Sequence, residues 1–275
     1  MIEILINGEV KDTISIQDRG LQYGDGLFET MAVHNGNIPL WEYHWQRLCL
    51  GCEKLSLSLP NKELIEKEIA LLCNNNEPKF VIKLILTRGE GQRGYRYPKE
   101  QNITRILSKH TWPNYPENNY SEGVAVCYCE TTLSVNKKLA EIKHLNRLEQ
   151  VLARNEWESD EFQEGLMSTI QGNVVDGTMS NIFAVQSNMI FTPGLSLCGV
   201  AGVMRKTIIN IAKNNGFAVY EKEFSKSELE MADELFLSNS LFGIWPVKTI
   251  GKTRFTKVGK VTKQLQKEIN KLCQL

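Results

Sequence analysis

Residues 140–149 read Ala-Glu-Ile-Lys-His-Leu-Asn-Arg-Leu-Glu, and this stretch carries the strongest indication of the fold. It places Lys143 between Ile142 and Leu145, where an extended pattern gives way to a helical one. Lysines are seldom buried, and burial lowers the pKa of a lysine towards that of a usable nucleophile or base. Taken alone, the pattern favours a solvated lysine beside a helix start over a catalytic lysine.

The composition excludes several classes of protein. The chain of 275 residues is long enough for one large domain or two small ones, and 42% hydrophobic with 23% charged residues is typical of an ordinary soluble globular protein. Lys and Arg number 32, as do Asp and Glu, so the formal charge is zero. No overall basic field exists to bind nucleic acid or an anionic membrane, and an anionic ligand must be bound by a local site.

Targeting signals and cysteine usage predict a cytoplasmic protein with reduced thiols. No apolar run approaches the roughly 20 residues of a membrane span, and the start of the chain lacks the basic region and apolar core of a signal peptide. The 7 cysteines are an odd number without the spacing of a disulfide framework. The cysteine pairs and the 4 histidines also lack the spacing of metal ligands, so no metal is expected.

The first hundred or so residues indicate a mixed α/β arrangement. Alternating isoleucines lead up to the turn Asn7-Gly8, and an apolar run from Phe28 to Val33 leads up to Asn35-Gly36, so both ends predict hairpin turns. Apolar residues at helical spacing predict two helices, over 39–55 and 62–73, and the run 80–86 predicts a buried strand.

A stretch without periodicity separates two regions of regular pattern. Residues 109–122 contain Pro113 and Pro116 and predict a domain boundary. We therefore expect a small N-terminal α/β domain over 1–112, a linker over 113–122 and a larger C-terminal domain over 123–275, in the α/β (α+β) class. The elements expected beyond the linker are a strand over 124–129, a helix over about 144–157, a strand pair around Gly172-Asn173, a helix over about 202–215, a short helix opened by a capping box of Ser225 and Glu228, a strand over 234–237 and an amphipathic C-terminal helix.

Motifs for dinucleotides, P-loop phosphates, serine hydrolases and zinc proteases are absent from the chain. The segment from Ile142 to Glu149 instead resembles the lysine segment of the class IV (fold type IV) pyridoxal-phosphate enzymes, which include the branched-chain and D-amino-acid aminotransferases. Further blocks that resemble this family occur in its order: Asp18-Arg-Gly, 23–30, His44-Trp-Gln-Arg-Leu48, 87–95, Ser180-Asn-Ile-Phe183, 199–205 and 238–247. Each block is weak alone, and together they make a strong match.

The resemblance implies a two-domain fold with a larger C-terminal pseudo-barrel, pyridoxal 5′-phosphate as the cofactor, and a homodimer. It implies that Lys143 is the catalytic residue and binds the cofactor. The cofactor phosphate is a dianion that needs a cation and oriented N–H donors. The other cofactor-binding residues that the resemblance implies are Arg47, Asn181, Val203, Met204, Ser240 and, at the pyridine nitrogen, Asp176. For Arg47, a solvated helix face remains the alternative.

Asp176 departs from the family pattern. The family has a glutamate that pairs with the protonated pyridine nitrogen, whereas the aligned segment here, 172–181, offers an aspartate that is one methylene shorter. Because Gly177 follows it, Asp176 can equally be a turn aspartate without a catalytic role.

Substrate recognition is implied by the segment from Arg88 to Tyr95. It matches a loop that binds a substrate carboxylate in related aminotransferases, and the residues implied in substrate binding are Arg93, Tyr95, Thr30 and Asn239. The segment after Lys143 is most similar to that of the aminodeoxychorismate lyases. The reaction so implied converts a small molecule, aminodeoxychorismate, to 4-aminobenzoate and pyruvate, with Lys143 removing the C4 proton. The alternatives are a D-amino-acid or branched-chain aminotransferase and, less favoured, a non-catalytic protein.

Overall fold

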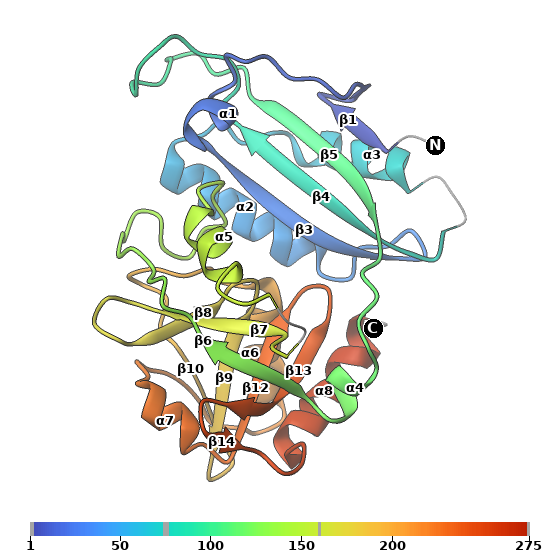
Figure 1. The fold of residues 1–275 in the computed structure, drawn as a ribbon. Coiled ribbons are helices and arrows are strands. Elements are labelled where there is room, and N and C mark those ends of the chain that lie inside the picture. The colour runs from blue at the N-terminus through green and yellow to red at the C-terminus, as the bar shows by residue number, and fades with distance from the viewer. Residues whose placement is uncertain (1–2, 74–76, 159–160, 274–275) are drawn as a thin grey trace. The chain divides into compact units, whose positions relative to one another are not determined.

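The computed structural model describes residues 3–73, 77–158 and 161–273, and the chain divides into two compact units (Figure 1). The first unit comprises Met1–Pro113 together with Ile142–Asn146, and the second comprises Asn114–Glu141 and Arg147–Leu275. Both units mix helices with sheets, which confirms the predicted α/β class. None of the described helices is long and apolar enough to cross a membrane.

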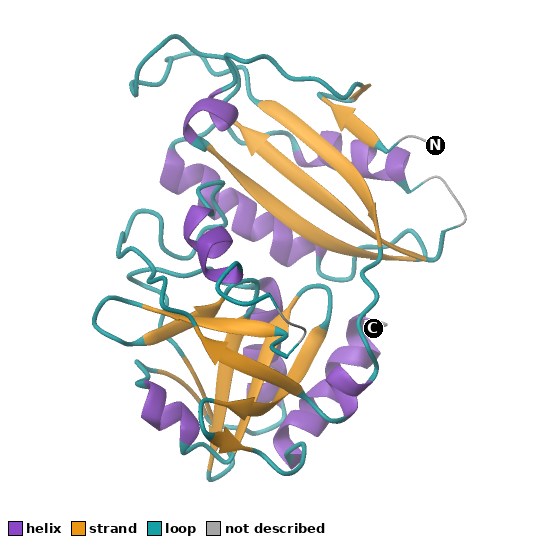
Figure 2. Ribbon diagram, in the orientation of Figure 1, coloured by secondary structure: helices purple, strands orange, loops and turns teal. Residues whose placement is uncertain are grey.

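The first unit is built on a five-stranded antiparallel sheet in the order β2-β1-β5-β4-β3. Its elements are β1 (Ile4–Ile6), β2 (Glu9–Val10), α1 (Arg19–Tyr23), β3 (Gly26–His34), α2 (Trp41–Leu55), α3 (Lys62–Leu72), β4 (Lys79–Thr87) and β5 (Thr104–Thr111). Helices α2 and α3 lie against the same face of this sheet (Figure 2). The alternation of strand residues fixes which side chains meet these helices.

Both predicted two-residue turns form. Asn7 (φ 53°) and Gly8 (φ 86°) take the left-handed conformations of such a turn and join β1 to β2. Asn35 (φ 47°) and Gly36 (φ 78°) do the same, and His34 and Asn37 exchange backbone hydrogen bonds of 2.8 and 2.9 Å across the turn. The pairing at this second turn ends with Asn37, and the strand that pairs with β3 along its length is β4, beyond two intervening helices.

The second unit contains a six-stranded ring. The sheet runs β9-β12-β13-β6-β7-β8, and the pairing of Asp176 in β8 with Asn181 at the start of β9 closes it. This closure confirms the barrel expected for the C-terminal domain. The elements of this unit are α4 (Asn118–Ser121), β6 (Val124–Tyr128), α5 (Leu148–Arg154), β7 (Glu164–Ser168), β8 (Val174–Gly177), β9 (Asn181–Gln186), β10 (Met189–Thr192), α6 (Val203–Asn214), β11 (Val219–Glu221), α7 (Lys226–Glu230), β12 (Glu234–Asn239), β13 (Gly243–Ile250), β14 (Thr253–Arg254) and α8 (Lys260–Cys273).

The segment expected to be a linker belongs to the core of the second unit. Tyr115 lies edge-on to Trp245, with 5.0 Å between ring centroids, and Tyr120 packs on the same indole at 6.3 Å. The chain forms α4 here, and Tyr120 lies within this helix. The prediction of a linker over 113–122 thus needs correction, because the two tyrosines supply apolar surface that the helical and strand periodicities do not register.

The helix expected over about 144–157 is shorter, and α5 spans only Leu148–Arg154. The residues before it are extended because their backbone groups are used by β3. The Phe28 N–H donates to the Lys143 carbonyl at 2.9 Å, and the Leu145 N–H donates to the Gly26 carbonyl at 3.0 Å. This pairing explains why Ile142–Asn146 belongs to the first unit.

The predictions that rest on helix caps are confirmed. Ser225 and Glu228 form the predicted capping box at the start of α7. The predicted helix over about 202–215 is α6, and Gly216 (φ 81°) follows its C-terminal cap. All seven cysteines are free thiols in the structure.

Candidate active site

Lys143 lies on the extended segment that pairs with β3. Its side chain is half-buried, and its Nζ lies 4.5 Å from the centroid of the Phe28 ring. The backbone hydrogen bond from Phe28 to the Lys143 carbonyl fixes where the side chain leaves the main chain. The Lys143 amine is therefore held over an aromatic face, with only part of its surface in water.

Glu29 stands on the inward face of β3, among apolar residues, and is 1% exposed. Strand alternation puts it on the same side as Leu27, which packs against Gly51 of α2. Its carboxylate accepts hydrogen bonds from Arg47 Nε at 2.8 Å and from His44 Nδ1 at 2.6 Å, both on α2. Arg47 Nη2 completes a two-pronged pair with the same carboxylate.

The pKa values of this cluster follow from burial and from its charges. Burial alone would raise the pKa of Glu29, but the Arg47 guanidinium and His44 bring it down to about 2. Burial lowers the pKa of His44 against the opposing effect of Glu29, and Arg47 and Lys143 lower it further. Glu29 is therefore an anion. The positive charge of Lys143 acts on His44, which lies one turn of α2 from Arg47.

Arg47 is thus a buried side chain and not part of a solvated helix face, since it is 9% exposed. Its guanidinium is held in one orientation by the carboxylate of Glu29. Thr30, a predicted substrate residue, is half-buried on the opposite face of β3, where its neighbour across the sheet is Lys83.

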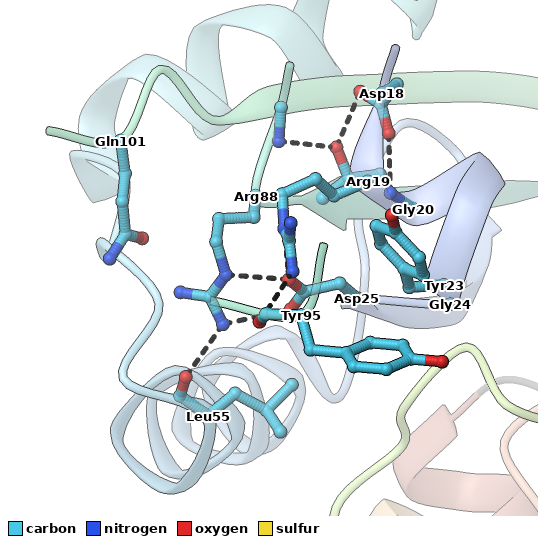
Figure 3. A network of polar contacts seen from close by, with 12 residues as sticks. Asp18, Arg19, Gly20, Tyr23, Gly24, Asp25, Leu55, Arg88, Tyr95 and Gln101 are labelled. Atoms are coloured by element: carbon cyan, nitrogen blue, oxygen red, sulfur yellow. Dashed lines mark hydrogen bonds and ion pairs between the residues drawn. The ribbon is translucent and has the colours of Figure 1, made fainter. Parts of the chain in front are cut away.

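Arg93 and Tyr95 lie on an exposed loop after β4, and Tyr95 is 88% exposed. Hydrogen bonds hold the backbone of this loop, because Arg19 donates to the carbonyls of Gly94 at 2.9 Å and Tyr95 at 3.2 Å. Figure 3 shows Arg19 beside Tyr95. The two residues that sequence reasoning assigned to the substrate are therefore presented outward from a backbone that is held in place.

Asp176 lies in β8, and burial raises the pKa of its carboxyl to about 7 despite hydrogen bonds from the Val200 N–H and the Asn181 amide, each at 2.7 Å. These neutral donors position the carboxyl without supplying a full counter-charge. Asp176 is 6% exposed, so it is a buried acid and not a solvated turn aspartate.

Asn181 connects Asp176 to the start of α6. Its Nδ2 donates both to Asp176 and to the Val200 carbonyl at 2.8 Å. Its Oδ1 would lie 2.0 Å from a Cβ atom at Gly202, so only glycine allows this approach. Gly202 is the N-cap of α6 and makes no side-chain hydrogen bond to the first turn. The N–H groups at Val203 and Met204 thus begin a helix that lacks a side-chain cap.

Asn239 and Ser240 lie at the turn between β12 and β13. The Asn239 Oδ1 accepts the N–H groups of Leu241 and Phe242, both at 2.9 Å, so this oxygen stabilises the turn. Ser240 is half-buried in the same turn. Its neighbour Ser238, which we did not predict, pairs with Asn181 across the sheet, and its hydroxyl is buried without a hydrogen-bond partner among the described residues.

The structure distributes the predicted residues over both units. In the first unit, Lys143 and Arg47 both lie close enough to His44 to lower its pKa, whereas Thr30 lies on the other face of β3 and Arg93 on an exposed loop. In the second unit, Asn181 joins Asp176 to Val200, two residues before the N-cap of α6. The described residues contain no cluster of His, Cys, Asp and Glu suited to a metal ion.

The motifs assign no role to the residues that hold the predicted side chains in place. These residues are Glu29, His44, Arg19, Asp25 and Arg88. The sequence does contain a signal for Glu29, because strand alternation places it on the same apolar face as Leu27 and Met31. A charge on a buried face requires a partner, and His44 and Arg47 recur at helical spacing with Leu48.

Comparison with known proteins gives a consistent result. The family described as amino-transferase class IV matches residues 26–250. An aminodeoxychorismate lyase of Vibrio harveyi is 34% identical over 269 residues, covering 96% of this chain and 98% of the relative. A D-alanine aminotransferase of Listeria monocytogenes is 28% identical over 290 residues, covering 99% and 98%. The crystal structure of 4-amino-4-deoxychorismate lyase from Pseudomonas aeruginosa matches with a TM-score of 0.92 and 42% identity, covering 98% of each chain.

The raised pKa of Asp176 predicts how the stability of ligand-free protein depends on pH. With a pKa of about 7, Asp176 retains its proton in the folded protein up to about pH 7, whereas the unfolded chain releases it near the ordinary aspartate pKa of 3.8. Stability from this group is therefore present at low pH and is lost as pH rises through that window, by about 4 kcal/mol in total. Asp176→Asn should lack this loss, so its unfolding free energy should gain on that of the wild type between pH 4 and pH 8.

Urea denaturation of both proteins at a series of pH values measures this difference. Asp12→Asn, at an exposed aspartate, is the control, and its profile should run parallel to that of the wild type. If the profile of Asp176→Asn also ran parallel, Asp176 would not hold a proton in the folded protein.

Proposed function

Since the chain belongs to the class IV aminotransferase family, we propose that it uses pyridoxal 5′-phosphate to convert 4-amino-4-deoxychorismate to 4-aminobenzoate and pyruvate, a step of folate biosynthesis. The observation that carries this proposal is the similarity over nearly the whole chain to lyases with this substrate in their names. The fixed loop that presents Arg93 supports it, because the substrate has two carboxylates.

One arginine, one helix start and one hydroxyl are proposed to bind the phosphate of the cofactor. A phosphate dianion needs a cation and oriented N–H groups. We assign these roles to Arg47, whose guanidinium is oriented by Glu29, and to the first turn of α6 at Val203 and Met204, which has no side-chain cap. Ser240 is the hydroxyl assigned to the same phosphate.

Asp176 fits the pyridine nitrogen. Its carboxyl is buried and is held by two neutral donors, so a cationic N–H placed beside it would supply the missing counter-charge and lower its pKa. The proposed role of Asp176 is therefore to keep a proton on the ring nitrogen. Asn181 positions Asp176 through its amide, and the aspartate held in this way is proposed to take the place of the family's longer glutamate.

When bound, the cofactor accepts the electron pair left at a carbon that loses its proton. In this proposal Lys143 binds the cofactor through its Nζ and, once released as a free amine, takes the proton from C4 of the substrate. The same side chain, now protonated, donates to the enolpyruvyl oxygen as it leaves. Loss of that group makes the ring aromatic, so the protein mainly has to hold the C4 hydrogen near Lys143.

A second candidate function is an aminotransferase for D- or branched-chain amino acids. It is favoured by the similarity to D-alanine aminotransferase and by the fact that Lys143, Arg47 and Asp176 would serve both reactions. The two functions differ in what happens to the amino group. A lyase regains its starting form in each cycle, whereas an aminotransferase must pass the amino group to a keto acid.

The proposal predicts sustained turnover without a keto acid. Purified enzyme loaded with pyridoxal 5′-phosphate should release 4-aminobenzoate and pyruvate in equal amounts from aminodeoxychorismate alone, over many turnovers. Both products can be measured by chromatography. Sustained turnover of D-alanine with 2-oxoglutarate, and none of aminodeoxychorismate, would refute the lyase proposal in favour of the aminotransferase.

The two basic residues should fail in different ways. Lys143→Ala should abolish turnover because it removes both the attachment point and the base. Arg47→Ala should weaken retention of the cofactor by about 1.5 to 3 kcal/mol for the loss of a charge-assisted hydrogen bond, and it should also lower the stability of the fold because the buried Glu29 carboxylate loses its arginine. Equilibrium dialysis against pyridoxal 5′-phosphate and borohydride reduction followed by peptide mapping separate these effects. Normal activity of Lys143→Ala with a reducible linkage at another lysine would overturn the assignment.

We further propose that the enzyme is a homodimer, as the resemblance to its family implies. The outward presentation of Arg93 and Tyr95 supports this proposal, because such a loop is available to a second copy. Sedimentation velocity at assay concentration should show a dimer. A fully active, monomer-sized species would contradict it.

A further inference from the structure

Asp25 lies between two buried arginines in the first unit (Figure 3). Its Oδ2 accepts from Arg19 Nε at 2.9 Å and from Arg88 Nε at 2.8 Å, and its Oδ1 accepts from Arg88 Nη2 at 2.9 Å. The arginines are 3% and 2% exposed. Buried charges are costly unless they are paired and fully hydrogen-bonded, so Asp25 is the group that allows both cations to be buried here.

Arg19 uses its other N–H groups on the loop. It donates through Nη1 to the Gly94 carbonyl and through Nη2 to the Tyr95 carbonyl. The Gly94 N–H donates to the Tyr23 hydroxyl at 3.2 Å, and the rings of Tyr23 and Tyr95 meet edge to face at 5.7 Å. Gly91 lies so close to Arg19 that a Cβ atom there would be 2.8 Å from its Cδ. The loop is thus held on both sides of Arg93.

Arg88 uses its other N–H groups on the end of α2. It donates to the Leu55 and Ser56 carbonyls, both at 2.8 Å. The last carbonyls of a helix have no partner within the helix, so Arg88 fixes this end of α2. Because α2 also carries Arg47 and His44, Asp25 connects the helix that bears the phosphate cation to the loop that bears Arg93.

A purely structural ion pair does not require this arrangement. Each arginine donates its remaining N–H groups to main-chain carbonyls. Arg19 donates to the loop and Arg88 to the end of α2. Each guanidinium contacts a pair of oxygens that a lysine ammonium cannot span. Burial would raise the pKa of Asp25, but Arg88 and Arg19 hold it below its usual value, so the bridging carboxylate stays charged. The geometry therefore fixes the two segments relative to one another.

We propose that Arg19, which Asp25 joins to Arg88, is a positioning residue that fixes the 90–95 loop relative to α2 and so places Arg93 to receive a carboxylate of the substrate. This rests on the proposed function for the identity of the substrate. The fixing of the loop itself does not depend on that function.

The test compares two conservative variants in enzyme loaded with pyridoxal 5′-phosphate. Arg19→Lys keeps the cation beside Asp25 but loses the fork that holds Gly94 and Tyr95. Arg105→Lys is the matched control, because Arg105 makes a buried pair with Glu68 in the same unit and does not touch the loop. We measure trypsin cleavage after Arg93, which is exposed, and the kcat and KM for aminodeoxychorismate.

Arg19→Lys should cleave about ten-fold faster after Arg93 and raise KM about ten-fold, as expected for a lost charged hydrogen bond, with kcat nearly unchanged. Arg105→Lys should leave both readouts at wild-type values. If Arg19→Lys does not fold, Tyr23→Phe removes only the hydroxyl bound to Gly94 and should shift both readouts in the same direction by a few fold.

Each contrary outcome has a distinct meaning. Unchanged cleavage in Arg19→Lys would overturn the fixing of the loop. Faster cleavage with an unchanged KM, or with a loss confined to kcat, would overturn the placement of Arg93 for a carboxylate. Failure of wild-type enzyme to convert aminodeoxychorismate would refute the proposed function and with it the substrate part of this inference, while the cleavage arm would still decide whether the cluster holds the loop.

Discussion

The buried pair of Glu29 with Arg47 is the interaction on which the first unit depends. It joins the inward face of β3 to α2, and it sets the direction of the only arginine that the family resemblance assigns to the phosphate. Removing one partner of such a pair leaves a buried charge, which typically costs about 3 to 5 kcal/mol. Because β3 also pairs with the Lys143 segment, one strand determines the positions of both basic residues.

The buried carboxyl groups of this protein divide by the charge of their partners. Glu29 and Asp25 are surrounded by cations, which hold their pKa values low in spite of burial. Asp176 accepts hydrogen bonds from two neutral donors, and burial raises its pKa to about 7 although the charges of Arg205 and Arg147 act to lower it. The first two are therefore permanent anions that hold the scaffold. Asp176 retains the capacity to respond to an added cation, which is the property required of a group that faces a ring nitrogen.

Two glycines allow side chains to pack directly against the backbone near the predicted binding residues. Gly202 admits the Asn181 amide at the start of α6, and Gly91 admits the stem of Arg19 beneath the loop. In both places a polar side chain is pressed against backbone near a predicted binding residue. The same principle applies in both units: a site residue is exposed or polar, and the residues that hold it are buried behind it.

Features that depend on neighbouring residues could be predicted from the amino-acid sequence. The Asn7-Gly8 turn and the Ser225 capping box form as predicted, because left-handed φ angles and cap hydrogen bonds involve only residues a few positions apart. Lys143, Arg47 and Asp176, to which the motifs assign roles at the cofactor, are buried or half-buried in the structure. Their assigned chemistry remains a proposal.

The contacts of those residues follow from the folded chain and could not be predicted from local patterns. The strand partner of β3, the extended path of the Lys143 segment and the packing of Tyr115 on Trp245 all join positions far apart in the chain. No periodicity encodes such pairings, so a helix was expected at His144 and a linker at Tyr115. The same holds for Asp25, whose role arises because folding brings one carboxylate between two arginines, each of which is also bound to a different segment of backbone.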